Sequence, residues 1–320
     1  MGRAKEASRL IRTESLTKFY GRRCAVRDLD VEIADNEIVG FLGRNGAGKT
    51  TTLRMLAGLL APSSGRIHID GREMDADNAA EVRWRIGFLP QQPPLYEDMT
   101  VRGFFDFAAR LRGIEDGVEA RIDEVTEMVD VVDYRDERIG NLSDGYKQRV
   151  GIGQAVIHDP ALVILDEPTS QLDPAQLREM RTIIRQLKDR HTVLLSSHNL
   201  PEISQTCDRL MVIHDGQLQA TGDEESLRGK LGAGNKVELA VIGSAEKLDE
   251  TLTVLQKDGL VAGVSVQAHG DQLFVDATLT RDEPQRLARA VIEAGLDLTR
   301  LQPQQNELEA VFLQLTGEQP

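Results

Sequence analysis

The glycine-rich stretch GRNGAGKTT, Gly43–Thr51, constrains this chain more than any other part of its sequence. Two glycines with four residues between them are followed by Lys and Thr, which is the phosphate-binding loop pattern. A short apolar run, Ile38–Leu42, precedes it and is typical of a buried strand. Apolar residues that suit the buried side of a helix follow it: Leu53, Met55, Leu56, Leu59 and Leu60. A strand, a glycine loop and a helix in this order predict a nucleotide-binding α/β fold.

The residues of this loop are suited to hold the phosphates of a nucleotide. Gly43, Gly46 and Gly48 can take positive φ and leave room for phosphate oxygens. Backbone amides at a helix N-terminus then form an anion cradle. Lys49 would reach the β- and γ-phosphates, and the Thr50 hydroxyl would ligate Mg²⁺. The remaining loop residues for which we expect ATP contacts are Arg44, Asn45, Ala47 and Thr51.

Length and composition are those of an ordinary globular protein. The 320 residues allow one large and one smaller domain. Contents of 40% hydrophobic and 28% charged residues are typical of soluble proteins. We expect no membrane span, because no apolar run approaches the roughly 20 residues that a span requires. We also expect no secretion signal, because the start MGRAKEASRLIR lacks the apolar core of one. The formal net charge of −14 argues against broad coating of nucleic acid.

Tyr20 is the first candidate contact outside the loop. Residues 13–33 form short alternating segments that predict strands, and Tyr20 lies among them. An aromatic ring at this place could stack on adenine, a contact worth roughly 1–3 kcal/mol in comparable pairs. An ordinary strand aromatic is the alternative, and the residues alone leave both open.

Residues 95–150 predict a helical insertion in the α/β chain. One amphipathic helix, from Val101 to Arg112, carries Phe104, Phe105, Phe107, Ala108 and Leu111. A second apolar face is formed by Val118, Ile122, Val125, Val129 and Val132. Ser143 is then suited to cap a third helix, which would stop near Pro160.

Polar residues follow two predicted strands at the point where each strand ends. The apolar run Leu162–Leu165 ends in Asp166 and Glu167, and Thr192–Leu195 is followed shortly by His198. In a nucleotide site one acid organises Mg²⁺ and the other polarises the attacking water. A histidine at the carboxyl end of a parallel strand can donate to a phosphate oxygen. Two acids on a surface loop are the alternative, which the preceding strand and the phosphate loop disfavour.

Taken in order, these motifs resemble those of the nucleotide-binding subunit of an ATP-binding cassette (ABC) transporter. The resemblance covers roughly residues 13–230. Its motifs are the phosphate loop, a glutamine loop (Gln91), a signature (Leu142–Arg149), a Walker B strand (Leu162–Glu167), a D-loop (Ser170–Asp173) and a switch histidine (His198). The resemblance implies a P-loop NTPase fold with a RecA-like core, an antiparallel β subdomain and the helical insertion.

The resemblance also implies roles for single residues. Tyr20 would stack on adenine, and Lys49 would hold the phosphates. The implied metal ligands are Thr50, Gln91 and, through water, Asp166. The implied catalytic residues are Glu167 as general base, His198 on the γ-phosphate, and Gln91. The cofactors would therefore be ATP and Mg²⁺.

In this family two copies pack head to tail, so the signature residues Leu142, Ser143, Asp144, Gly145 and Tyr146 would act in trans. Ser143 and Gly145 would reach the γ-phosphate on the partner, and Asp173 would link the two sites. The usual signature is LSGGQ, whereas this chain has LSDGY. A carboxylate some 4 Å from a phosphate would cost roughly 4 kcal/mol at an effective dielectric near 20. We therefore expect Asp144 to turn aside, toward Lys147 or Arg149.

Residues 1–12 would be an N-terminal extension. Residues 235–320 predict a separate small α+β domain of ferredoxin-like type, joined through the glycines of Gly229–Asn235. Its expected elements include a hairpin (Val264–Val266 with Leu273–Val275), a helix (Glu283–Ala294) and a final helix (Leu308–Leu315). It resembles the C-terminal domain of many type-2 exporter ATPases, for which dimer support or regulation is the expected role.

The resulting interpretation is an ATPase that powers a separate membrane permease, peripherally at the cytoplasmic face of the cell membrane. The signature is similar to that of gliding-motility-associated and related type-2 exporters. The expected partners are permease subunits, contacted near Tyr96 and Met99, and a second copy or a related ATPase subunit, with no nucleic acid. A soluble cassette ATPase acting on DNA or ribosomes is the alternative; such proteins typically carry two cassettes or a coiled-coil insertion. A small-molecule kinase would explain the phosphate loop alone.

Overall fold

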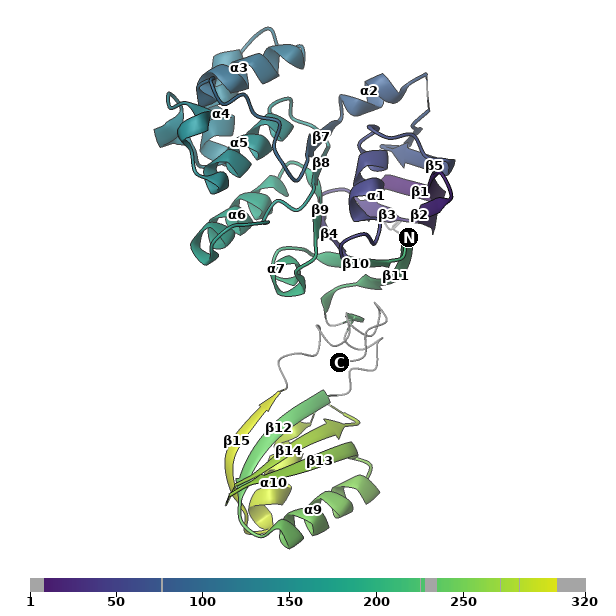
Figure 1. The fold of residues 1–320 in the computed structure, drawn as a ribbon, viewed down its shortest axis with the longest axis vertical. Helices are drawn as coiled ribbons and strands as arrows, with labels where there is room; N and C mark the ends of the chain where they lie inside the picture. The colour runs from purple at the N-terminus through teal and green to yellow at the C-terminus, as the bar shows by residue number, and fades with distance from the viewer. Residues whose placement is uncertain are drawn as a thin grey trace, which may run out of the picture. The chain divides into compact units, whose positions relative to one another are not determined.

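A computed structural model describes residues 9–75, 77–224, 226–227, 235–270, 272–281 and 283–303. The chain forms two compact units, residues 1–223 and 224–320, drawn in Figure 1. The domains predicted from the sequence were 13–230 and 235–320. Two predicted features, most of the linker Gly229–Asn235 and the final helix Leu308–Leu315, lie outside the described residues. Within the part that is described, no helix is long and apolar enough to cross a membrane.

A six-stranded sheet forms the centre of the first unit, in the order β11-β10-β4-β9-β8-β7. Its strands are β4 (Ile38–Leu42), β7 (Ile86–Leu89), β8 (Leu162–Leu165), β9 (Thr192–Ser197), β10 (Arg209–His214) and β11 (Gln217–Gly222). All neighbours run parallel except β10 and β11. Every residue of β4 and β8 is buried, as expected for strands covered on both faces. The segments that follow β4, β8 and β9 therefore meet at one edge of this sheet.

The helices of this core are α1 (Lys49–Leu56), α2 (Ala79–Arg83), α6 (Pro174–Leu187) and α7 (Leu200–Ser204). Helix α1 begins directly after Gly48 and buries Leu53, Met55 and Leu56, as predicted. The prediction was wrong for Leu59, which is 58% exposed. The reason is that Gly58 takes a φ of +67° and ends the helix before Leu59.

An antiparallel subdomain lies beside the core, with the strand order β2-β1-β5-β6 and β3 paired to β1. Its strands are β1 (Arg9–Tyr20), β2 (Arg23–Leu29), β3 (Glu32–Ala34), β5 (Ser64–Ile69) and β6 (Arg72–Glu73). Because β1 begins at Arg9, residues 9–12 belong to this sheet rather than to an N-terminal extension. A tight turn at Gly21, with φ of +59°, places Tyr20 opposite Arg23 at the end of the hairpin.

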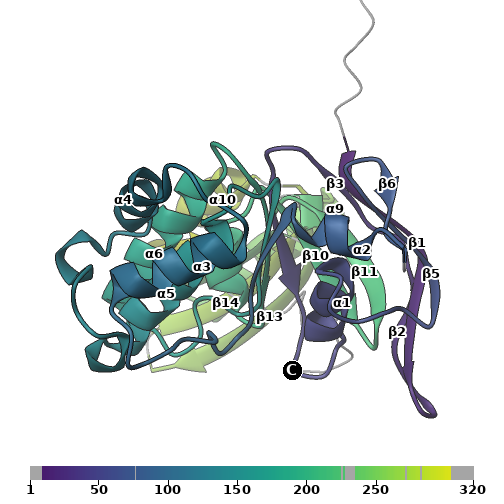
Figure 2. The same ribbon diagram turned by 90° about the horizontal axis from the view of Figure 1, so that it is seen from above.

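The insertion forms a helical subdomain that Figure 2 shows to one side of the core, away from β1, β2 and β5. It comprises α3 (Val101–Leu111), α4 (Val118–Met128), the short 3-10 helices η1 (Val132–Tyr134) and η2 (Ile139–Asn141), and α5 (Asp144–Val156). Three expected core residues are instead exposed: Phe107 by 39%, Leu111 by 70% and Val132 by 46%. Val132 lies beyond α4 because the chain turns at Asp130, where φ is +54°.

The second unit has the ferredoxin-like topology that the sequence predicted. Its elements are β12 (Asn235–Ile242), α9 (Ala245–Lys257), β13 (Val261–His269), β14 (Gln272–Leu279), α10 (Pro284–Glu293) and β15 (Asp297–Pro303). All neighbours in the order β13-β14-β12-β15 are antiparallel. Leu248 and Leu252 of α9 and Leu287 of α10 share one core with Leu239 and Val275 of the sheet.

Candidate nucleotide-binding site

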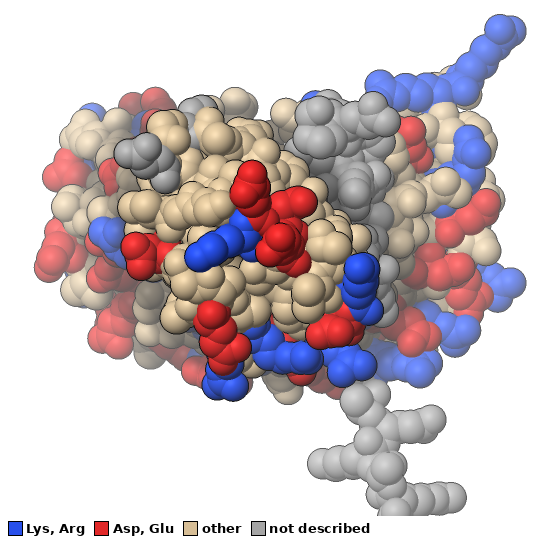
Figure 3. Space-filling view, turned by 90° about the horizontal axis from the view of Figure 1, so that it is seen from below, with Lys and Arg blue, Asp and Glu red and all other residues tan. Residues whose placement is uncertain are grey.

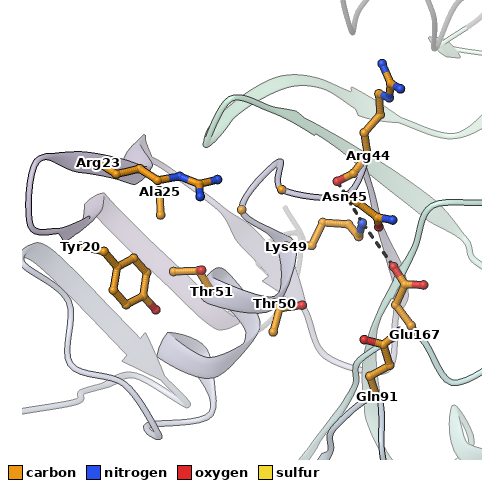
Figure 4. A pocket seen from close by; sticks show the side chains of 12 residues that line it. Tyr20, Arg23, Ala25, Arg44, Asn45, Lys49, Thr50, Thr51, Gln91 and Glu167 are labelled. Atoms are coloured by element: carbon orange, nitrogen blue, oxygen red, sulfur yellow. Dashed lines mark hydrogen bonds and ion pairs between the residues drawn. The ribbon is translucent and has the colours of Figure 1, made fainter.

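A pocket of about 290 Å³ opens where the carboxyl edge of the parallel sheet meets the start of α1 (Figure 4). It is lined by Tyr20, Arg23, Ala25, Arg44, Asn45, Gly46, Gly48, Lys49, Thr50, Thr51, Gln91 and Glu167. These residues come from the β1–β2 hairpin, the glycine loop with α1, and the segments after β7 and β8. The fold thus brings together four segments that are far apart in the sequence.

The glycines of the loop are required by its close packing. A Cβ atom at Gly43 would lie 2.6 Å from the carbonyl oxygen of Ile213, and one at Gly48 would lie 2.6 Å from that of Ala25. Gly46 and Gly48 also have φ values of +86° and +106°, which favour glycine. The loop therefore keeps the backbone free of side chains at the N-terminus of α1, where amides and helix dipole attract anions.

The side chain of Lys49 is buried and fully engaged. Its Nζ donates to the carbonyl oxygens of Gly43 (2.6 Å) and Arg44 (3.3 Å). The same atom lies 3.3 Å from Oε1 of Glu167, and both side chains are less than a tenth exposed. Figure 4 shows Lys49 extending across the pocket toward Glu167. A buried ammonium needs such partners, and they hold it beside the phosphate cradle.

Thr50 and Asp166 provide oxygen atoms of the kind that Mg²⁺ prefers. The Thr50 hydroxyl donates to Asp166 Oδ1 at 3.3 Å, and Asp166 is buried at the end of β8. Gln91 lies next to Glu167 at the same end of the pocket (Figure 4). Among the residues that the structure describes, no group of three or more acidic, His or Cys side chains could hold a metal alone. The donors fit a Mg²⁺ ion that takes its other ligands from phosphates and water.

Glu167 and His198 form a pair at this edge. Nδ1 of His198 lies 2.6 Å from Oε2 of Glu167, and His198 remains about half exposed while Glu167 is buried. Strand β9 extends through Ser197, two residues further than predicted, and His198 follows it directly. A carboxylate held by a lysine and a histidine beside a phosphate cradle is placed to accept a proton from water.

The opposite end of the pocket is formed by the β1–β2 hairpin. The Tyr20 ring is 48% exposed and lies far from Glu167 across the pocket (Figure 4). Sequence reasoning missed Arg23 and Ala25. The pairing of Tyr20 with Arg23 across a glycine turn was a signal that could have identified Arg23. Ala25 gave no signal, because it enters the lining only through its close approach to Gly48.

The signature residues do not line this pocket. Ser143 caps α5 by accepting the N–H of Tyr146, at 3.5 Å. Gly145 lets α5 approach α6, since a Cβ there would lie 2.8 Å from the Gln176 side chain. Ser143 and Asp144 are exposed. A second cavity, of about 370 Å³, is lined by Gln91, Gln92, Pro93, Leu95, Glu97, Asp144, Lys147, Gln148, Ser170 and Gln171.

Asp144 was expected to turn aside, toward Lys147 or Arg149, and both of these cations have other acidic partners. Lys147 binds Glu97 at 3.1 Å. Arg149, also in α5, is buried and contacts Asp130 and Glu179. Neither cation forms an ion pair with Asp144 in the described part of the chain. Asp144 lies instead in the first turn of α5, where the helix dipole favours a negative charge.

Tyr146, which stands where the usual signature has glutamine, is a packing residue. Its ring centroid lies 4.2 Å from that of Tyr134, and the Arg149 guanidinium lies 4.8 Å from its ring centroid. A hydrogen bond with Tyr134 raises the pKa of the Tyr146 phenol. The start of α5 is therefore supported from behind by aromatic and cation–π contacts.

Asp173 of the D-loop caps α6. Its Oδ1 accepts the N–H groups of Ala175 (2.8 Å) and Gln176 (2.9 Å). The Gln176 side chain returns to the Asp173 N–H at 3.3 Å, which completes a capping box. The same Gln176 side chain lies against Gly145, so the cap adjoins the signature.

Comparisons with known proteins give separate evidence on the family of this chain. Residues 26–170 match a family model described as ABC transporter. The chain is 36% identical over 320 residues to the bacitracin transport ATP-binding protein BcrA of Bacillus licheniformis, covering 97% of this chain and 98% of the relative. It is 32% identical over 314 residues to the daunorubicin resistance ATP-binding protein DrrA3 of Streptomyces coeruleorubidus, covering 98% and 97%.

Among solved structures, the chain resembles the dimeric structure of MJ0796, described as a bacterial ABC transporter cassette. The TM-score is 0.61 at 25% sequence identity, over 67% of this chain and 98% of that chain. The two curated relatives, by contrast, match this chain along nearly its whole length. The similarity to them therefore includes the ferredoxin-like unit.

Proposed function

The chain belongs to the ABC transporter ATP-binding proteins, and on that premise we propose that it hydrolyses ATP in the pocket of Figure 4 to drive an export permease. The observation that carries the proposal is the buried Glu167 carboxylate, which lies between Lys49 and His198 at the phosphate cradle. The names of the two relatives refer to bacitracin transport and daunorubicin resistance, which supports export as the direction of transport.

The residues divide the chemistry among them. The glycine loop and Lys49 would bind the β- and γ-phosphates, whose oxygens replace the Gly43 and Arg44 carbonyls as partners of Nζ. Mg²⁺ held near Thr50, Gln91 and Asp166 would supply charge neutralisation on the phosphate oxygens. Tyr20 would stack on adenine at the other end of the pocket.

Glu167 is the proposed general base. Binding of phosphate to Lys49 would release Oε1 of Glu167 to take a proton from the attacking water. His198, protonated on Nδ1, would keep the carboxylate in place by donating to Oε2, while its exposed face turns to the γ-phosphate. The proton thus moves from water to Glu167 as the new P–O bond forms and the bond to the β-phosphate oxygen breaks.

A second ATPase subunit, either another copy or a related chain, would complete each site. The support for this is that Ser143 and Asp144 are exposed at the start of a capped helix and outside their own chain's nucleotide pocket. Helix N-termini bind anions, so this one is suited to the γ-phosphate on a partner. Asp173, which caps α6 beside the signature, would couple the two sites.

Docking to the permease would use an exposed apolar strip on the helical subdomain. The Tyr96 ring is 55% exposed and meets Phe107 edge-on at 5.6 Å between centroids. Leu111, one helical turn after Phe107, extends the strip and is 70% exposed. Met99, the other residue that the sequence predicted for this contact, is half-buried. A strip of this kind marks an interaction site and would bring the chain peripherally to the cytoplasmic face of the membrane.

A soluble ATPase that acts on DNA or ribosomes is the less favoured function. Binding to a phosphate backbone depends on gathered basic side chains. On the face drawn in Figure 3, Lys and Arg side chains are mixed with Asp and Glu side chains on a largely uncharged surface. The near full-length similarity to transport subunits also favours the transporter function.

The test is to express the Glu167→Gln chain in its native cells and to extract membranes with ATP and mild detergent. We expect a polytopic membrane protein to co-purify, because the chain would be trapped with ATP bound. Tyr96→Ala combined with Phe107→Ala should abolish this recovery. The control Leu59→Ala, which changes an exposed apolar residue outside the strip, should not. Recovery only from the soluble fraction, with ribosomes or DNA, would replace the proposal by the less favoured function.

A further inference from the structure

The hydroxyl of Ser196 connects the two acids of the site from behind. It donates to Oδ1 of Asp166 at 2.7 Å and accepts the backbone N–H of Glu167 at 2.9 Å. Ser196 is completely buried in β9, the strand that pairs with β8. A serine hydroxyl has one donor and acceptor lone pairs, so both bonds form at once.

The backbone of Glu167 requires a partner of this kind. Its φ is +51°, in the left-handed region that residues other than glycine rarely occupy. Such a conformation persists only where the surrounding structure fixes it, and it is found at functional sites. Lys49 and His198 hold the carboxylate of Glu167, whereas Ser196 holds its backbone N–H.

We propose that Ser196 is a positioning residue for ATP hydrolysis. By accepting the Glu167 N–H while it donates to Asp166, it fixes the left-handed turn that aims the Glu167 carboxylate into the pocket. The inference rests on the proposed role of Glu167 as general base. Without the hydroxyl, the turn loses the bond that ties it to β9, and the carboxylate loses its fixed direction. The bonds of the Ser196 hydroxyl go to Asp166 and Glu167, whereas Lys49 bonds to Gly43, Arg44 and Glu167, so the groups proposed to hold the phosphates do not depend directly on Ser196.

The test is steady-state ATPase kinetics and nucleotide binding on the purified full-length chain. Ser196→Ala should lower kcat roughly tenfold to a hundredfold, since misplacing a general base forfeits part of its effect. The KM for ATP and the nucleotide Kd should stay within about threefold, because ground-state binding is untouched. Ser196→Thr, which keeps the hydroxyl, should recover most of kcat, with Ser196→Cys as a second variant if the added methyl lowers the Tm.

Thr192→Val is the matched control. It removes another buried hydroxyl of β9, bonded to the Asn36 N–H at 2.9 Å at the far end of the strand. It should leave kcat unchanged.

If Ser196→Ala lowers nucleotide affinity and Tm together with kcat, the hydroxyl is structural and the inference is overturned. If Glu167→Gln abolishes hydrolysis but Ser196→Ala does not slow it, the inference alone fails. If Glu167→Gln still hydrolyses ATP, the proposed function of the site fails first.

Discussion

Two regions of the ATPase domain differ in how their functional residues are held. In the catalytic edge, defined as Lys49, Asp166, Glu167, Ser196 and His198, the side chains bond to one another across strands β8 and β9 and the start of helix α1. In the signature end, defined as Ser143–Tyr146, Ser143 and Asp144 are exposed, whereas the Tyr146 ring packs against Tyr134.

The difference shows what each region still needs. The side chains of the catalytic edge bond to one another within one chain, so their arrangement does not depend on a partner subunit. At the signature end, Tyr146 and Arg149 pack together near the start of α5. The exposed start of this helix does not line the nucleotide pocket of its own chain. On the proposed function, one chain carries two unlike halves of a site, which a partner subunit would bring together.

The largest effect should come from separating these halves between chains. Lys49→Ala and Ser143→Leu should each reduce ATPase activity at least roughly a hundredfold, since each removes a group that we propose to contact the transferred phosphate. Mixing the two variants should restore on the order of a quarter of wild-type activity, because half of the dimers are mixed and each mixed dimer has one intact site. The measurement is ATPase activity of the variants before and after mixing.

Circular dichroism of Ser143→Leu is the control, because the substitution also removes the cap of α5. A helix signal equal to that of the wild-type chain shows that the loss arises at the site. If the mixture is no more active than its components, the signature does not act in trans and the comparison of the two regions fails.

A second prediction concerns the far end of the signature helix. His158 follows α5, and its Nε2 lies 3.2 Å from the carbonyl oxygen of Ile86 on β7. Burial, aided by the charge of Arg112, lowers the pKa of His158 from 6.5 to about 4. Between these values the unfolded chain binds more protons than the folded chain, so stability falls as the pH falls through this window.

Replacing His158 with Gln should therefore flatten the pH dependence of the unfolding free energy. The wild-type chain should lose up to roughly 3 kcal/mol more than the variant between about pH 6.5 and pH 4. Urea unfolding at several pH values measures this. Buried His191, whose pKa burial also lowers, remains in the variant and should keep part of the slope. Equal slopes in both chains would show that α5 is not anchored through a neutral His158.

Features that are encoded locally in the sequence were predicted well. The phosphate loop, the acids after β8 and the ferredoxin-like unit were predicted because short spacings and strand alternation encode them locally. Helix ends were less accurate: Gly58 was a stop signal that the prediction for Leu59 did not use, whereas the turn at Asp130 has no glycine to announce it.

Contacts between distant elements could not be predicted. The bond of Ser196 to Asp166 depends on β9 pairing with β8, which local pattern does not specify. The same holds for Asp144, because the sequence shows Lys147 and Arg149 nearby but not that Glu97, Asp130 and Glu179 already bind them. Lys49, Asp166, Glu167 and His198 were therefore found singly, whereas Ser196 and the bonds among these residues were not.

The smallest effect should come from Asp144, one of the two residues that depart from the usual signature. Asp144→Gly should leave ATPase activity within about an order of magnitude, because the carboxylate binds neither nearby cation and only a favourable helix-dipole contact of roughly 0.3–1 kcal/mol is lost. Asp144→Asn removes the charge at nearly constant size and should behave alike if the charge alone matters. Steady-state ATPase rates decide between these cases. A complete loss in Asp144→Gly would mean that the carboxylate acts directly at the partner's nucleotide, and the signature end would then supply chemistry as well as binding.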